Sequence, residues 1–151
     1  MSDQETAKEQ EGQKPKLANT FASFGVPKDA IADGEWVDFG FGVKIKIRSE
    51  RSDLARRTRR QIGIRDARLL SAQRGTYTSE QEDAVEVEVA KNAIVVAWEG
   101  VTDEKSKPLT CTKENVEHIM TALPALRDQV MRAANLDETF RRRGVEDIGG
   151  N

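Results

Sequence analysis

The alternation of apolar and polar side chains is clearest early in the chain. Val43-Lys44-Ile45-Lys46-Ile47-Arg48 alternates apolar and basic residues with a period of two, and Trp36-Val37-Asp38-Phe39 is rich in strand formers. Between them, Gly40-Phe41-Gly42 supplies residues that tolerate positive φ. The pattern predicts a β-hairpin over residues 35–48. An isolated hairpin is barely stable in water, so its apolar face must pack on helices or on another subunit.

A helical period replaces this alternation after the hairpin. Serine or threonine stands at the start of three of the expected helices, and Pro124 suits the first turn of a fourth. Alternating Val and Glu in residues 85–89 are also typical of a strand, but a longer apolar stripe through Trp98 favours a helix there. The expected helices are at about 52–70, 79–98, 112–123, 124–134 and 137–143.

The two ends of the chain are polar. Residues 1–18 contain almost nothing to bury, and residues 144–151 are polar and end in Gly-Gly-Asn, so both are expected to be flexible. The predicted fold class is α+β, a single and mostly α-helical domain over residues 19–143 with one N-terminal β-hairpin. A loop is expected between residue 19 and the hairpin. The core is expected to include Trp36, Trp98, Val116, Ile119 and Leu123.

Composition narrows the class of protein. Charged residues make up 33% of the chain and the net charge is −2, so there is no overall attraction to nucleic acid or to an anionic membrane. Cys111 is alone, which excludes an intramolecular disulfide and favours a reducing compartment. The N-terminus does not resemble a signal peptide, and no apolar run is long enough to span a bilayer. These features predict a soluble cytosolic protein.

Residues that could carry chemistry are few. His118 is the single histidine and Cys111 the single cysteine, so a His/Cys metal cluster cannot form. Nothing near them supplies an activated nucleophile with an orienting partner, and phosphate-binding, dinucleotide-binding and calcium-loop motifs are missing. We expect a protein that is not an enzyme and uses no cofactor or metal.

Clustered arginines between Leu54 and Arg68 are the strongest rival signal. Such a cluster on a helix could neutralise phosphates. However, no aromatic residues are interleaved for base stacking, and Asp53 and Asp66 interrupt the run. The acidic segment Glu80–Glu88 could instead return over the basic helix as its charge partner. A structural or partner-docking role therefore ranks ahead of nucleic-acid binding.

An ordered series of short motifs lies in the last two fifths of the chain. Trp98-Glu99-Gly100-Val101 is followed by a polar loop at Thr102–Lys107, then Pro108-Leu109, Thr112-Lys113-Glu114-Asn115-Val116 and a helix that breaks at Leu123-Pro124. In this order the series resembles the tail assembly chaperones of long-tailed (siphovirus-like) bacteriophages and prophages. The chain departs from the pattern at Lys105-Ser106-Lys107, where the family is expected to have an Asp-Gly turn.

The resemblance implies a function without catalysis. A protein of that family binds the tape measure protein in the host bacterial cytoplasm, keeps it soluble while tail tube protein polymerises around it, and is absent from the mature virion. The implied partners are the tape measure protein, the tail tube protein and further copies of the chain. The alternatives are a structural tail component, such as a tube or connector subunit, and a nucleic-acid-binding regulator acting through residues 54–68. Apolar contacts with partners are expected at Met120, Leu126, Val130, Met131 and Phe140.

The resemblance also implies a second, longer product. Members of the family are commonly made in two lengths through a minus-one ribosomal frameshift near the end of the shorter frame. Gly149-Gly150-Asn151 can be encoded by a slippery heptamer, although codon degeneracy allows many other spellings.

Overall fold

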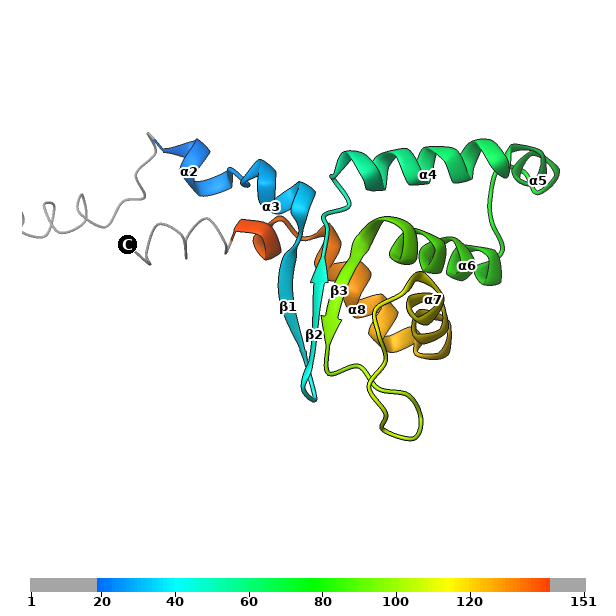
Figure 1. The fold of residues 1–151 in the computed structure, drawn as a ribbon. Coiled ribbons are helices and arrows are strands. Elements are labelled where there is room, and N and C mark those ends of the chain that lie inside the picture. The colour runs from blue at the N-terminus through cyan, green and yellow to red at the C-terminus, as the bar shows by residue number, and fades with distance from the viewer. Residues whose placement is uncertain (1–18, 142–151) are drawn as a thin grey trace, which may run out of the picture.

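A computed structural model describes residues 19–141 of the chain (Figure 1). Three antiparallel strands form one sheet in the order β1-β2-β3. Helices pack against it, which confirms the predicted α+β class. The expected flexible ends at 1–18 and 144–151, including Gly149–Asn151, lie outside the described residues. Strand bounds are β1 Glu35–Gly40, β2 Val43–Ile47 and β3 Val95–Glu99.

Most predicted helices are present with small changes in their ends. Two short helices precede the sheet where a loop was expected. The helical elements are α2 Thr20–Phe24, α3 Lys28–Asp33, α4 Asp53–Arg65, α5 Ala67–Ala72, α6 Ser79–Val89, the π-helix η1 Ala90–Ile94, α7 Lys113–Ala122 and α8 Pro124–Asn135. Residues 137–141 add a final helical segment, the described part of the helix expected at 137–143.

The predicted hairpin is confirmed, and its apolar side faces the helices. Val37 pairs with Ile45 across β1 and β2. Ile45 and Ile47 are fully buried, whereas Lys44 on the opposite side of the strand is exposed. Phe41 and Gly42 form the two-residue turn, with φ values of 55° and 80°. Positive φ at both positions matches the right-handed twist of the flanking strands.

The prediction of one helix over residues 79–98 is wrong at its C-terminal end. Regular α-helix ends at Val89, a π-helical turn follows, and Val95–Glu99 pairs with β2 as the third strand. β2 would otherwise present unpaired backbone N–H and C=O groups along this edge. The β-branched and aromatic residues Val95, Val96 and Trp98 suit that position, and non-local pairing overrides the helical stripe.

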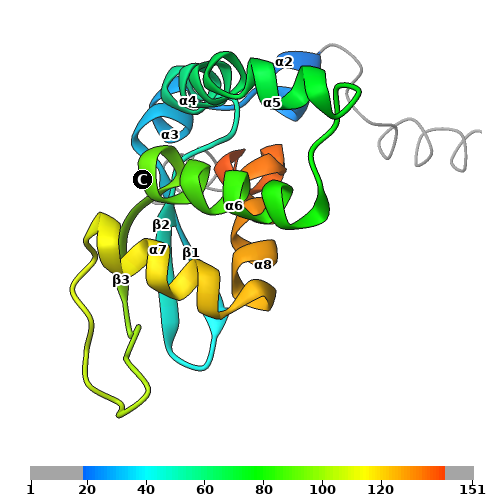
Figure 2. The same ribbon diagram turned by 90° about the vertical axis from the view of Figure 1, so that its right-hand side faces the viewer.

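The π-helix η1 lies at the centre of the molecule. It contacts β3 and four helices (α4, α6, α7 and α8), and Ala90, Ala93 and Ile94 are buried within it. Arg48, which follows β2, caps the C-terminus of η1. The Arg48 backbone N–H donates to Ile94 O at 2.8 Å, and its guanidinium donates to Ala93 O at 2.8 Å. In Figure 2, α6, which leads into η1, lies between α4 and α7.

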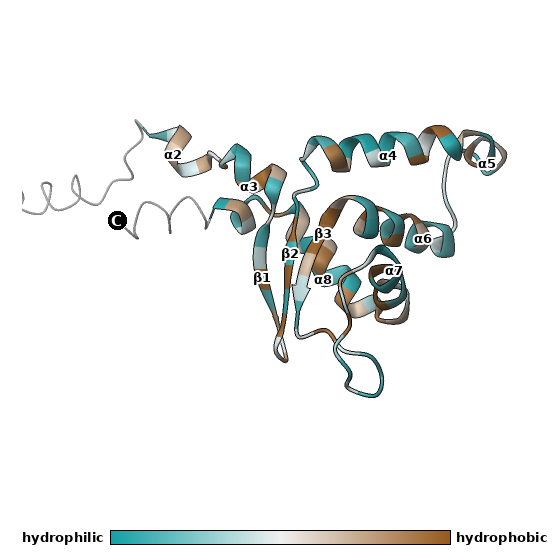
Figure 3. Cartoon of the chain, viewed as in Figure 1, coloured by the Kyte–Doolittle hydropathy of each residue, from teal (hydrophilic) through white to brown (hydrophobic). Residues whose placement is uncertain are grey.

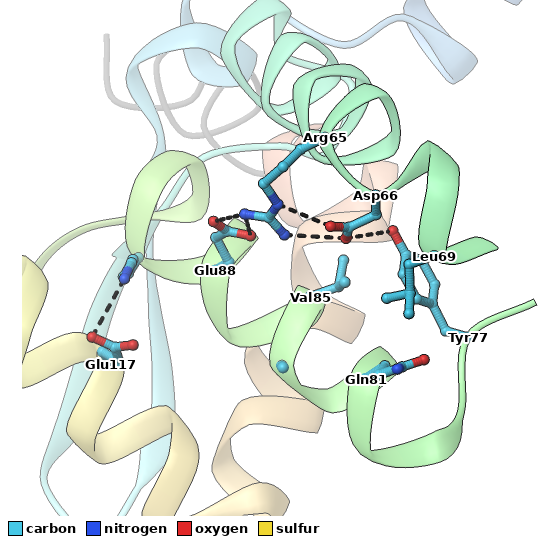
Figure 4. A pocket seen from close by; sticks show the side chains of 10 residues that line it. Arg65, Asp66, Leu69, Tyr77, Gln81, Val85, Glu88 and Glu117 are labelled. Atoms are coloured by element: carbon cyan, nitrogen blue, oxygen red, sulfur yellow. Dashed lines mark hydrogen bonds and ion pairs between the residues drawn. The ribbon is translucent and has the colours of Figure 1, made fainter. Parts of the chain in front are cut away.

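The helix predicted at 52–70 is divided at Asp66 into α4 and α5. The acidic segment on α6 pairs with α4, as the sequence predicted. Arg59 Nη1 lies 3.0 Å from Glu86 Oε1, and its guanidinium also binds Glu50. Arg65 Nη1 lies 2.6 Å from Glu88 Oε1 (Figure 4). Two arginines thus join α4 to α6.

Asp66 completes the Arg65 cluster. Its carboxylate accepts hydrogen bonds from Arg65 Nε at 3.0 Å and from the Tyr77 hydroxyl at 2.9 Å (Figure 4). The Arg65 guanidinium, and after it the Tyr77 hydroxyl, lowers the pKa of Asp66 below its ordinary value, because both stabilise the ionised form. Tyr77, beyond the end of α5, is thereby held near the break between α4 and α5.

The predicted core is right for three residues and wrong for two. Trp98, Val116 and Ile119 are buried. Trp36 is 43% exposed, because it lies on the outer face of β1 opposite Lys46. Leu123 is 47% exposed, because α7 ends at Ala122 and the residue before a proline is disfavoured in helical conformation.

Candidate partner-binding groove

Four of the five predicted partner contacts lie inside the molecule. Met120, Val130, Met131 and Phe140 are all buried in the hydrophobic core. The described fold does not leave them on an open surface, because α7 and α8 turn the apolar sides that carry Met120, Val130 and Met131 onto η1, α6 and each other. Leu126 differs from these four. It is half-buried and lines a groove that opens to solvent.

This groove lies between the tip of the β1–β2 hairpin and the junction of α7 and α8. It has a volume of about 390 Å³. In Figure 2 the hairpin tip reaches beside that junction. One wall is made by the hairpin and the other by the helices, and nearly all of the lining side chains are apolar. The walls include Phe39, Phe41, Val43, Leu123, Pro124 and Leu126, with Gln129 as a polar contribution.

Phe41 is the most exposed side chain of the groove. It is fully exposed, and its backbone is left-handed with a φ of 55°. A bulky residue rarely adopts this conformation, which costs roughly 1–2 kcal/mol relative to glycine. Asparagine or glycine would form the same turn with less strain. A strained and exposed phenylalanine at a turn therefore points to a role in binding rather than in folding.

Leu123 forms the opposite wall because of the proline that follows it. Its backbone is not helical, with φ −123° and ψ 75°, so α7 and α8 meet at this residue instead of forming one helix. The Leu-Pro step noted in the sequence is thus what presents Leu123 to solvent. The Gly-Phe-Gly turn was also visible in the sequence, but only the fold places it beside Leu123.

Trp98 anchors the long loop next to the groove. Its indole N–H donates to Leu109 O at 2.7 Å, and Leu109 N–H donates to Val101 O at 2.9 Å. Within the loop, Asp103 Oδ1 accepts backbone hydrogen bonds that close the turn, and Ser106 is left-handed with a φ of 62°. Ser106 therefore adopts the backbone conformation that a glycine would favour, although the expected Asp-Gly pair is replaced.

Cys111 and His118, the two residues considered for chemistry, share no hydrogen bond in the described structure. Cys111 is half-buried, and burial raises the pKa of its thiol, which reduces the reactive thiolate fraction at neutral pH. His118 is exposed on α7. In the part of the chain that the structure describes, no three His, Cys, Asp or Glu residues are placed to hold a metal ion.

Comparison with protein families identifies the family of the chain. Residues 46–151 match the family described as "YdaY prophage protein". The chain belongs to the YdaY prophage protein family. The matched region contains β3 and all helices from α4 to α8, so it includes the Leu123 wall of the groove, whereas Phe41 lies before it.

The family description establishes a prophage protein and names no role in tail assembly. No curated protein and no solved structure matches the chain. Among residues 19–141, no helix is long and apolar enough to cross a membrane.

Replacement of Phe41 by asparagine tests whether this turn serves binding. Asparagine tolerates a left-handed backbone far better than phenylalanine, so the variant is expected to be more stable by about 0.5–1 kcal/mol. It should also bind an apolar partner less well, because a large exposed side chain is removed from the groove. Urea unfolding measures the first effect. A loss of stability would contradict the assignment of strain to this position.

Proposed function

We propose that this prophage protein is a tail assembly chaperone that binds the tape measure protein through the groove between the hairpin tip and the α7–α8 junction. The observation that supports the proposal most directly is the open apolar groove itself, with Phe41 and Leu123 exposed on its two walls. The prophage family and the ordered motifs from Trp98 to Leu123 agree with it. The action is expected in the host bacterial cytoplasm, where tails assemble.

The groove has the chemistry needed to accept an amphipathic helix. Such helices place apolar side chains at positions i, i+3, i+4 and i+7 in an apolar groove. Phe41, Leu123 and Leu126 are apolar, and Gln129 at the edge can bond to a polar residue of the bound helix. A long helical protein exposes this kind of stripe until its tube subunits cover it. Shielding the stripe requires contact area rather than a reaction.

The alternative of a tube or connector subunit has less support. Such subunits are usually rich in β structure, whereas the described residues contain one three-stranded sheet. Binding to tail tube protein, absence from the mature virion and a longer frameshifted product belong to the same chaperone proposal. The frameshift concerns Gly149–Asn151, outside the described residues.

Co-expression with the tape measure protein of the same prophage tests the proposal. The tape measure protein should be largely insoluble alone and be recovered as a soluble complex with this protein. Leu123→Asp and Phe41→Asp should each reduce the recovered complex by about tenfold or more, because a charge in an apolar contact loses its hydration without a partner. Both side chains are exposed in the free protein, so the fold should persist, which circular dichroism can check.

Phe21→Asp is a matched control. Phe21 is 92% exposed on α2 and is not part of the groove. This variant should bind the tape measure protein like the unaltered chain. If the groove variants and the Phe21 variant lose binding equally, the groove is not the binding site. If the unaltered protein fails to keep the tape measure protein soluble, the chaperone proposal itself is wrong.

A further inference from the structure

The outer side of α4 carries arginines that form no salt bridge with the described part of the chain. Arg56, Arg57 and Arg60 are exposed, and none forms a salt bridge with another described residue. Residues spaced by three or four lie on one face of a helix, so Arg60 neighbours both of the others. Beyond α4, Arg68 in α5 and Arg74 after it are also exposed and form no salt bridge with another described residue. We call Arg56, Arg57, Arg60, Arg68 and Arg74 the outer arginine strip.

The carboxylates near α4 are already paired on its inner side. Glu50 and Glu86 bind Arg59, while Glu88 and Asp66 bind Arg65 (Figure 4). Asp66, which interrupts the arginine run in the sequence, is therefore neutralised and its side chain is only 16% exposed. Asp53, in the first turn, is the single acid within α4. The fold thus separates the arginines into a paired inner set and an unpaired outer set.

The position of α4 leaves the outer arginine strip accessible. α4 packs on η1 and α6 through Ala55, Thr58 and Ile62, which are buried. It lies at the edge of the molecule in Figure 1, and much of its ribbon has the colour of hydrophilic residues in Figure 3. Arg56, Arg57 and Arg60 lie within about 6 Å along the axis of α4, so their charges are concentrated on about one turn of the helix.

We propose that the outer arginine strip binds the phosphate backbone of duplex nucleic acid without reading its sequence. This activity is separate from the groove and does not require a tape measure protein. Guanidinium groups bind phosphate oxygens in a bidentate manner, and all five cations of the strip are arginines. The strip contains no aromatic residue on which an unpaired base could stack, which favours a duplex over a single strand.

The surface fits phosphate better than an acidic protein. Protein interfaces combine charged residues with a well-packed apolar centre. On α4, Ile64 is the one large apolar side chain that is strongly exposed, so a protein partner would gain little contact there. A net charge of −2 for the whole chain opposes binding at long range. We therefore expect weak binding that is local to the strip and sensitive to salt.

Fluorescence anisotropy with a labelled duplex of about 20 base pairs tests this proposal. At low salt, the full chain should bind with a dissociation constant of about 10⁻⁴–10⁻⁶ M, and log K should fall against log salt with a slope of about −2.7 to −4.5 for three to five phosphate contacts. The triple variant Arg56→Glu/Arg57→Glu/Arg60→Glu should lose binding at every salt concentration. All three side chains are exposed and form no salt bridge with another described residue, so the variant should fold.

A matched control has the same change in net charge at another place. Lys28→Glu/Lys105→Glu/Lys107→Glu reverses three exposed lysines outside α4 and should keep most of the binding. Equal loss in both triple variants would mean that only net charge matters and would overturn the proposal. Absence of binding by the unaltered chain at low salt would overturn it as well. The proposal would also be overturned if polyglutamate displaced the labelled duplex as effectively as unlabelled duplex does, because the strip would then be a site for carboxylates.

The groove variants separate this proposal from the chaperone function. Leu123→Asp leaves the outer arginine strip unchanged and should bind the duplex nearly as well as the unaltered chain. The arginine triple variant should in turn still keep the tape measure protein soluble. If each variant lost both duplex binding and the ability to keep the tape measure protein soluble, the two surfaces would not be independent.

Discussion

Replacement of Trp98 by alanine is expected to lower the free energy of unfolding by about 3–5 kcal/mol, the range for truncating a buried aromatic side chain. Trp98 is 8% exposed, pairs with Ile45 in the sheet and donates its indole N–H to Leu109 O at 2.7 Å. The variant therefore loses apolar contacts and leaves a carbonyl group without its partner. For a domain of this size, that is a large share of the total stability.

Urea unfolding followed by circular dichroism measures this effect. Trp36→Ala is the matched control, because Trp36 is partly exposed on the outer face of the same sheet and should cost about 1 kcal/mol or less. Trp98→Phe keeps the aromatic bulk but loses the hydrogen bond, so an intermediate loss of about 1–3 kcal/mol is expected. If Trp98→Ala and Trp36→Ala unfold at the same urea concentration, Trp98 is not a core residue.

Gly100→Ala is expected to destabilise the fold by about 3 kcal/mol or more. Gly100 has a φ of 77°, and a Cβ atom there would lie 2.0 Å from Gly42 O in the hairpin turn. The left-handed backbone accounts for roughly 1–2 kcal/mol. The remainder comes from moving a backbone carbonyl, which cannot yield as a flexible side chain can. Because Gly42 follows Phe41, this displacement should also disturb the groove.

Gly75→Ala separates the two contributions. Gly75 has a φ of 83°, but nothing lies within 4 Å of an added Cβ. Alanine at this position should cost only the backbone strain, about 1–2 kcal/mol. Comparison of the two variants by urea unfolding measures the contact between Gly100 and the hairpin turn. Equal losses would mean that the turn yields freely and that Gly100 does not position Phe41.

The individual residues of the groove could be predicted from local sequence patterns, whereas their proximity depends on the tertiary structure. Leu126 was identified as a partner residue from its apolar stripe, and the Leu123-Pro124 step and the Gly-Phe-Gly turn were both noted. Their meeting was not predicted, because it requires the hairpin to lie against α7 and α8. The buried set of Met120, Val130, Met131 and Phe140 shares the same helical pattern as Leu126. Hydrophobic periodicity identifies an apolar face but not what covers it.

The amino-acid sequence alone determined the hairpin, the starts of α4, α6, α7 and α8, and the pairing of basic α4 with acidic α6. In each case the interacting residues are close in sequence, or their opposite charges are sufficient to bring them together. Tertiary structure decided the third strand, the π-helical turn and the exposure of Trp36 and Leu123. Val95–Glu99 became a strand because β2 offered an unpaired edge from a distant part of the chain. The apolar pattern of a segment indicates which of its sides must be buried, whereas the element that packs on that side depends on the whole fold.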